Sequence, residues 1–221
     1  MSRYKHIDID GNNIDLPVGK IVCVGRNYLQ HIKELDNEIP TEPLLFNKPS
    51  TALSALNSPI IIPKNLGSCE HELEVAVLVK TRICRASIKK AGAAIWGIGL
   101  GLDLTLRDVQ SALKKQGHPW ERSKAFDSSC PMSQFIAIEQ VKNLSNIDFC
   151  LCVNNQLRQH GNSRNMLFPI VKLLKNISNT FTLLPGDIVM TGTPKGVAAL
   201  TTGDRLFIDL NEHFSVRTDV I

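Results

Sequence analysis

The 221-residue sequence contains no uninterrupted hydrophobic run long enough to cross a membrane as a helix, which takes about 20 apolar residues. Residues 1–15 are polar and lack the apolar core of a secretory signal peptide. The sequence therefore predicts a protein without membrane segments, and a cytoplasmic location is the expectation.

Dense basic blocks and ordered cysteine pairs are absent too. The net charge is only +4, and no Lys/Arg cluster contains interleaved aromatic residues, so nucleic-acid binding is not expected. The six cysteines are scattered through apolar stretches, which favours reduced thiols over a disulfide framework. Cys150 and Cys152 are two residues apart, but no second pair completes a tetrahedral zinc site.

Common nucleotide and hydrolase motifs are missing as well. The sequence has no G-x-x-x-x-G-K-[ST] loop, and the alternating glycines at 97, 99 and 101 do not form G-x-G-x-x-G. It has no G-x-S-x-G nucleophile elbow. Nucleotide binding and classical serine-hydrolase chemistry therefore have no support in the sequence.

The hydrophobic pattern predicts more strands than helices. Strands are expected at 20–25, 44–47, 59–63, 72–79, 96–106, 135–138, 148–153, 187–191, 205–210 and 214–218. Helices are expected at 27–35, 107–116 and 164–177, the last with a kink or early turn at Pro169. Strand-helix-strand units rarely alternate, which favours a β-rich α+β fold with a mixed sheet. We expect a small N-terminal extension at 1–18 and a single domain at 19–221.

Three carboxylates stand inside apolar segments. Glu72 and Glu74 begin the strand at 72–79 and point to the same face, and Asp103 interrupts the sequence IGLGLDLTL. Burying like charges so close together is costly unless a cation lies between them, and three oxygen donors suit Mg²⁺ or Mn²⁺. The alternative is ordinary: an exposed Glu-x-Glu pair on an edge strand, and an aspartate that caps a strand or forms a salt bridge.

A second group of polar residues lies on the expected helix at 27–35. His31 and Glu34 are spaced so that they can touch, and a carboxylate that orients a histidine could create a general base. An exposed helix pair is the simpler interpretation of these two residues alone. Lys124 is expected in a loop, where a surface lysine is the simplest interpretation. The same holds for Arg26, Lys48, Arg107 and Gln110.

Several segments together resemble the fumarylacetoacetate hydrolase family, and its small acylpyruvase/oxaloacetate decarboxylase branch in particular. They are VGRNYLQH at 24–31, LFNKPSTA at 45–52, HELEVAV at 71–77, GLDLTLRDVQ at 101–110, WERSKAFDSSCP at 120–131 and GDIVMTGTPKGV at 186–197. The resemblance covers roughly residues 20–221. It implies a β-rich mixed-sheet roll, commonly a homodimer.

The resemblance also implies roles for individual residues. It places Mg²⁺ or Mn²⁺ on Glu72, Glu74 and Asp103. The residues implied in catalysis are His31 and Glu34, as a dyad, and Lys124. The residues implied in substrate contact are Arg26, Arg107, Gln110 and Thr193.

The expected function is that of a metal-dependent enzyme on a small 2-oxo acid. Hydrolysis of an acylpyruvate to pyruvate and a carboxylic acid, decarboxylation of oxaloacetate, or both are expected first. Keto–enol tautomerisation of oxaloacetate or another isomerisation is the alternative, because all three reactions share an enolate. A non-catalytic module that binds a metal or an oxo acid is an alternative of another class, as is a structural protein that uses its sheet as an interface.

Overall fold

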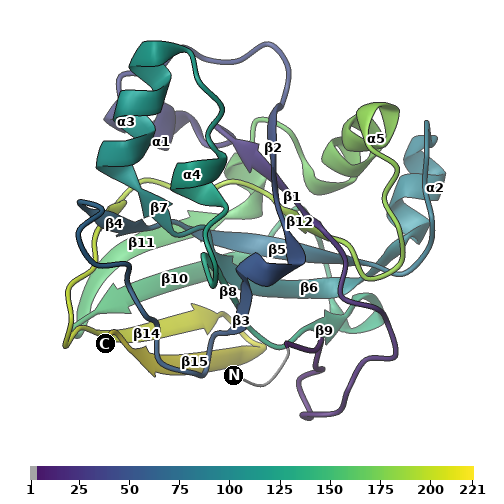
Figure 1. Ribbon diagram of the computed structural model, residues 1–221. Helices are drawn as coiled ribbons and strands as arrows, with labels where there is room; N and C mark the ends of the chain where they lie inside the picture. The colour runs from purple at the N-terminus through teal and green to yellow at the C-terminus, as the bar shows by residue number, and fades with distance from the viewer. Residues whose placement is uncertain (1–3) are drawn as a thin grey trace.

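The computed structural model describes residues 4–221, which are built around an eight-stranded mixed sheet (Figure 1). Its main path runs β2-β1-β12-β5-β6-β8-β3, with β9 paired to β6. The strands of this sheet are β1 (Ile21–Gly25), β2 (Leu44–Lys48), β3 (Leu53–Ala55), β5 (Leu73–Val79), β6 (Ile95–Leu102), β8 (Cys130–Met132), β9 (Ile136–Ala137) and β12 (Ile188–Met190). β1 pairs parallel with β12, whereas β5 pairs antiparallel with both neighbours.

Two smaller sheets complete the fold. The four-stranded sheet has the order β11-β10-β14-β15 and consists of β10 (Asp148–Val153), β11 (Gln156–Asn162), β14 (Arg205–Leu210) and β15 (Phe214–Asp219). The three-stranded sheet consists of β4 (Cys69–His71), β7 (Thr105–Leu106) and β13 (Ala198–Ala199). Strands dominate over helices, so the predicted α+β fold with a β-rich mixed sheet is confirmed.

The helices are short and lie outside the sheets. They are α1 (Leu29–Glu34), α2 (Ile88–Ala93), α3 (Arg107–Gln116), α4 (Glu121–Lys124) and α5 (Ile170–Thr180), with 3₁₀ turns at Ser50–Ala52, Ile138–Gln140 and Ser163–Asn165. Figure 1 shows α1, α3 and α4 grouped at one end of the molecule and α2 beside α5 at another. Among residues 4–221, none of these helices has the length and apolar character of a membrane span.

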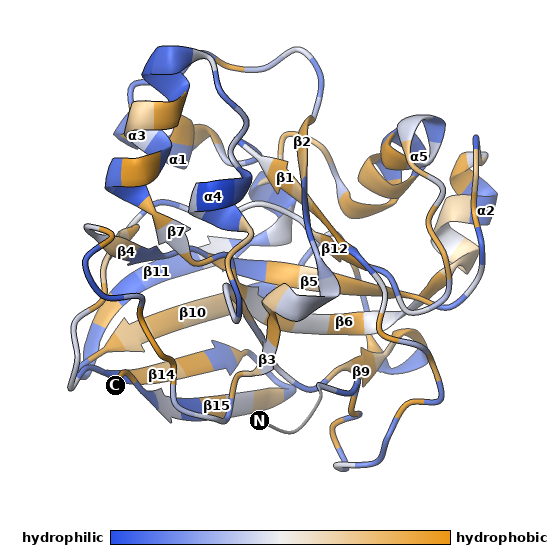
Figure 2. Cartoon of the chain, viewed as in Figure 1, coloured by the Kyte–Doolittle hydropathy of each residue, from blue (hydrophilic) through white to orange (hydrophobic). Residues whose placement is uncertain are grey.

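The central strand β5 accounts for the apolar segment at 73–79. All seven of its residues are buried, because β12 and β6 flank it and both of its faces are covered. Figure 2 shows the contrast between the apolar strand β10 and the hydrophilic helix α4. The expected strand at 72–79 is confirmed, apart from its first residue, and the interpretation of Glu72 and Glu74 as an exposed pair on an edge strand is wrong.

The alternating glycines of β6 permit a close approach of backbones. A Cβ atom on Gly97 would lie 2.0 Å from the carbonyl oxygen of Ile136, and one on Gly99 would lie 2.7 Å from that of Gln134. Neither distance is physically possible for a side chain. These glycines are therefore needed for packing, as expected for a glycine-spaced strand.

The predicted helix at 164–177 is wrong in its first part. A 3₁₀ turn covers Ser163–Asn165, and α5 begins only after Pro169, which has the extended ψ of 149°. A proline disfavours the helical conformation of the residue before it, so the helix begins directly after Pro169, at Ile170, and is not kinked by the proline. From there, Leu173, Leu174 and Ile177 form the buried face of α5.

The segment before the main sheet packs onto it. His6 is buried, and its Nε2 lies 3.1 Å from the carbonyl oxygens of both Pro17 and Gly186. Asp8 forms a bridge to Phe135. Residues 1–3 of the predicted extension at 1–18 lie outside the described residues, and the division between 1–18 and 19–221 stays a prediction.

Candidate metal centre and active site

The three carboxylates singled out from the sequence meet inside the fold. One oxygen from each of Glu72, Glu74 and Asp103 lies within 4.8 Å of the others, and all three residues are buried. Glu74 lies on β5 opposite Gly101 of β6. The amide of Asp103 donates to the carbonyl oxygen of Glu72 at 2.8 Å, so the backbone holds two of the three residues together.

Three cations neutralise two of these carboxylates. Lys124 Nζ lies 2.8 Å from Glu72 Oε2 and 2.6 Å from Asp103 Oδ2, and the fully buried Lys48 Nζ lies 2.9 Å from Asp103 Oδ1. Arg107 Nη2 contacts Glu72 Oε1 at 2.5 Å. Burial opposes ionisation of Glu72, but Lys124 and Arg107 outweigh it and hold the pKa of Glu72 well below its usual range.

Glu74 differs from the other two carboxylates. It has no cation within salt-bridge distance in the described chain, and its Oε2 accepts a hydrogen bond from the amide of Gly192 at 2.7 Å. Burial, followed by the charges of Asp103 and Glu72, raises the pKa of Glu74 well above its usual value. A buried carboxylate that gains so little from the protein's own cations fits a site for a hard divalent ion with oxygen ligands.

The hydrogen bond to Glu74 depends on a glycine. Gly192 has a φ of +94°, which favours glycine, and a Cβ atom there would lie 2.7 Å from Cβ of Asn27. Asn27 itself donates to the carbonyl oxygen of Thr191 at 2.7 Å. The loop after β12 is thus held against the turn after β1, with its amide directed at Glu74.

The predicted dyad is present as a contact. His31 Nδ1 lies 3.1 Å from Glu34 Oε2 on α1, and the amide of Gly196 donates to Glu34 Oε1 at 2.9 Å. His31 is buried and lines the same cleft as the three carboxylates. The interpretation as an exposed helix pair is therefore wrong for His31, and the catalytic role of the dyad stays a prediction.

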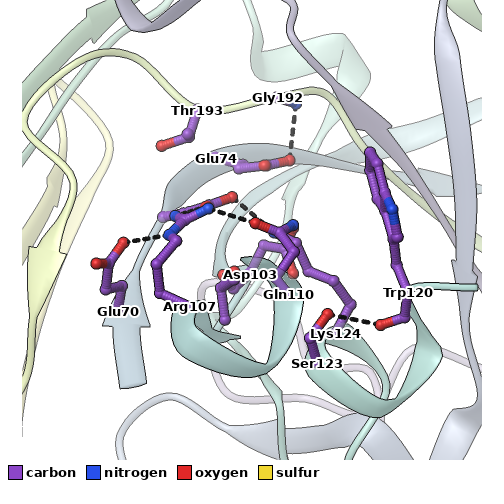
Figure 3. Close-up of polar contacts among 12 residues, drawn as sticks. Glu70, Glu74, Asp103, Arg107, Gln110, Trp120, Ser123, Lys124, Gly192 and Thr193 are labelled. Atoms are coloured by element: carbon purple, nitrogen blue, oxygen red, sulfur yellow. Dashed lines mark hydrogen bonds and ion pairs between the residues drawn. The ribbon is translucent and has the colours of Figure 1, made fainter. Parts of the chain in front are cut away.

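Lys124 is neither in a loop nor on the surface. It ends the short helix α4, is buried, and points at the carboxylates (Figure 3). Burial disfavours its charged form, but Asp103 and Glu72 outweigh this and raise the pKa of Lys124 above its usual value. Lys124 is therefore a fixed ammonium group in the centre of the site.

The four residues implied in substrate contact differ in how many of their hydrogen-bonding groups are already engaged within the protein. Arg26 and Gln110 line the cleft, and Gln110 Oε1 accepts from Arg107 Nη1 at 2.6 Å. Arg107 also contacts Glu70 Oε2 at 2.6 Å, so its fork already holds three partners. The hydroxyl of Thr193 donates to the carbonyl oxygen of Leu73 at 2.9 Å.

Two buried residues of the site were missed as functional candidates. Lys48 was interpreted as a surface lysine but is fully buried and contacts Asp103, Ser129 and the carbonyl oxygen of Lys124. Gln159 lies on β11, a strand that was not predicted, and its Nε2 donates to Thr193 Oγ1 at 2.8 Å. A signal for β11 exists in the sequence: Asn154 and Asn155 follow β10 and both adopt positive φ, as in a type I′ hairpin turn.

The three carboxylates, His31, Lys124 and the four residues implied in substrate contact line one cleft. Carboxylates and cations lie deep in it, and Phe46 and Trp120 form an apolar wall, with their ring centroids 6.0 Å apart. Lys124 and Glu74 both line this cleft, so a small anionic molecule that entered it could contact the ammonium group next to the three carboxylates. The arrangement suits polarisation of a carbonyl group next to a carboxylate.

The fold and this site place the chain in a known family of enzymes. A family model for the fumarylacetoacetate (FAA) hydrolase C-terminal region matches residues 20–221. The chain belongs to the fumarylacetoacetate hydrolase family.

Individual relatives make the comparison more specific. The chain is 47% identical to the oxaloacetate tautomerase YcgM of Escherichia coli (strain K12), and the alignment covers 99% of the chain and 100% of the relative. It is 43% identical to the human mitochondrial oxaloacetate tautomerase FAHD1, over 84% of each chain. Among solved structures, it matches the fumarylpyruvate hydrolase of Pseudomonas aeruginosa in complex with Mn²⁺ and pyruvate, with a TM-score of 0.92, 29% identity and coverage of 100% and 97%.

Proposed function

We propose that this protein is a divalent-metal-dependent enzyme that interconverts the keto and enol forms of oxaloacetate or a closely similar 2-oxo acid. The carrying observation is the buried group of Glu72, Glu74 and Asp103, in which Glu74 has no cationic partner in residues 4–221. The similarity to two oxaloacetate tautomerases supports this choice of reaction.

The proposed cofactor is Mg²⁺ or Mn²⁺, held by Glu72, Glu74 and Asp103. When bound, the ion would supply positive charge to the oxygens of the 2-oxo acid, where negative charge develops during enolisation. The Mn²⁺ and pyruvate in the structure of the fumarylpyruvate hydrolase relative support a divalent ion together with an oxo acid in this fold.

The protein's own residues would handle the proton. His31 has its Nδ1 engaged with Glu34 at 3.1 Å, which leaves Nε2 as the ring nitrogen that can accept a proton from the carbon next to the carbonyl group. Lys124 keeps its proton because it contacts two carboxylates, so it serves as a fixed positive charge beside the oxygen on which negative charge develops. In this proposal His31 transfers the proton and Lys124 stabilises the charge.

Acylpyruvate hydrolysis is the second candidate, and the same dyad favours it. A histidine oriented by a carboxylate that is itself held by the Gly196 amide can activate a water molecule. The homodimer expected from the family resemblance and the cytoplasmic location stay predictions, as does oxaloacetate decarboxylation.

The decisive experiment is a direct assay on oxaloacetate and acetylpyruvate, with and without EDTA. Loss of the enol absorbance band reports tautomerisation, and release of pyruvate reports decarboxylation or hydrolysis. Enol–keto exchange that EDTA abolishes and Mg²⁺ or Mn²⁺ restores is the expected result. Absence of all turnover from metal-loaded protein that binds Mn²⁺ would instead favour the non-catalytic binding module.

A further inference from the structure

A second group of cations lines the cleft beside the three buried carboxylates. Arg26, Arg107 and Lys114 all line the cleft, together with Asn37. Arg26 Nη2 donates to Asn37 Oδ1 at 2.8 Å, and Lys114 Nζ lies 3.4 Å from the same oxygen. Two full positive charges therefore share one neutral oxygen atom.

Arg26 and Lys114 lack the acidic partners that the other cations of the cleft have. Within residues 4–221, neither has a carboxylate oxygen within 4.0 Å, whereas Arg107 contacts both Glu70 and Glu72. Desolvation lowers the pKa of Lys114 most, and the neighbouring charges of Arg26 and then Arg107 lower it further. Cations crowded together without a counter-charge make a site for an anion.

The position of Arg107 relates this cationic group to the metal centre. Its Nη2 contacts Glu72, a proposed metal ligand, and its charge acts on Lys114. Arg107 thus lies between the carboxylates and the pair Arg26 and Lys114. A short chain-like molecule with its 2-oxo acid end at the carboxylates would have its other end near that pair.

We propose that Arg26 and Lys114, with Asn37, form a subsite for the second carboxylate of a dicarboxylic 2-oxo acid. This inference rests on the proposed function and adds to it the residues that recognise the anionic end of the substrate distal to the three carboxylates. Arginine can hold a carboxylate through two parallel hydrogen bonds, and the lysine adds a mobile point charge. Displacing Asn37 Oδ1 from these cations would free their donors for the substrate.

Lys114→Gln tests the subsite, because it keeps most of the side-chain length and removes the charge. Lys115→Gln is the matched control, since Lys115 is the next residue on α3, is exposed and does not line the cleft. Enol–keto exchange is measured for both substrates in each protein: oxaloacetate, with a carboxylate at each end, and acetylpyruvate, with a neutral methyl ketone end. Mn²⁺ affinity is measured by titration calorimetry as a readout of the metal centre.

The expected result is a loss of about 10-fold in kcat/KM for oxaloacetate in Lys114→Gln, mostly through KM, as for a lost hydrogen bond to a charged group. Acetylpyruvate turnover and Mn²⁺ affinity should be unchanged, and Lys115→Gln should match the wild type. An equal effect on both substrates, or none on oxaloacetate, would overturn the subsite and leave the proposed function standing. Wild-type protein that turns over neither substrate would overturn both.

Discussion

Replacing Lys48 by methionine tests whether its buried ammonium group stabilises the fold. The side chain is fully buried and has contacts to Asp103 at 2.9 Å and to both oxygens of Ser129, at 3.1 and 3.0 Å. Removing one partner of a buried ion pair costs about 3–5 kcal/mol. Asp103 retains Lys124, so we expect the lower value, about 3 kcal/mol.

For a chain of this length, that loss corresponds to a fall in Tm of about 6–12 °C, at about 2–4 °C per kcal/mol. Calorimetry in EDTA measures it, because a bound ion would stabilise the native state and mask the change. Lys80→Met is the control: its pair with Glu139 at 3.5 Å is exposed, and such pairs contribute about 0–1 kcal/mol. We also expect Lys48→Met to weaken Mn²⁺ binding by about 10-fold or more, since Lys48 orients Asp103.

A Tm for Lys48→Met within about 4 °C of the wild type, with unchanged Mn²⁺ affinity, would refute this reasoning. Burying the ammonium group would then cost as much free energy as its contacts return. In that case Lys48 would be a tolerated buried charge, and the orientation of Asp103 would depend on Lys124 and the backbone alone.

Three further variants test separate parts of the structure. Glu74→Gln should abolish turnover and weaken Mn²⁺ binding, which titration calorimetry measures. The same change should raise the Tm in EDTA, because it removes a buried carboxyl group with no cationic partner in the described chain. A lower Tm in EDTA would contradict this. His31→Ala should reduce acylpyruvate hydrolysis by about 10²–10⁴-fold and oxaloacetate decarboxylation less, and equal losses in the pyruvate-release assay would end that division of labour. Burial lowers the pKa of His6 below 6.5, so the unfolded chain binds its proton first and stability should fall as the pH drops below that value. In urea unfolding between about pH 7 and pH 5, His6→Gln should show a shallower decline than the wild type, and parallel curves would show that His6 does not contribute.

The buried group of three carboxylates, the proposed metal site, could be predicted in advance because charged residues are rarely buried without partners. Glu72, Glu74 and Asp103 are charged residues in segments whose apolar character predicts burial. The conflict between charge and burial is visible in the sequence, whereas the convergence of the three side chains depends on the pairing of β5 with β6. Only the family resemblance predicted that the three side chains would meet at one site.

The cations of the site were harder to identify. Lys48 and Lys124 are buried, but a lysine in sequence is on the surface by default, and only tertiary contacts with Asp103 reverse that expectation. Gln159 was missed because β11 carries polar side chains along most of its length and so lacks the alternation of a half-buried strand. Pro169 was recognised as a possible kink or early-turn residue. The helical spacing of the apolar residues nevertheless placed the start of the predicted helix at residue 164, before the proline, whereas α5 begins at Ile170.

The position of β12 in the large sheet has a consequence for how the protein is made. β12 lies between β1 and β5, so the first strand of the sheet cannot join its centre until residues 188–190 have left the ribosome. The amide that contacts Glu74 comes from Gly192, 118 residues further along the chain. Contacts of such long range form slowly. A nascent chain that ends before β12 would therefore carry its acidic residues without a cation site, which makes the whole centre a late product of synthesis.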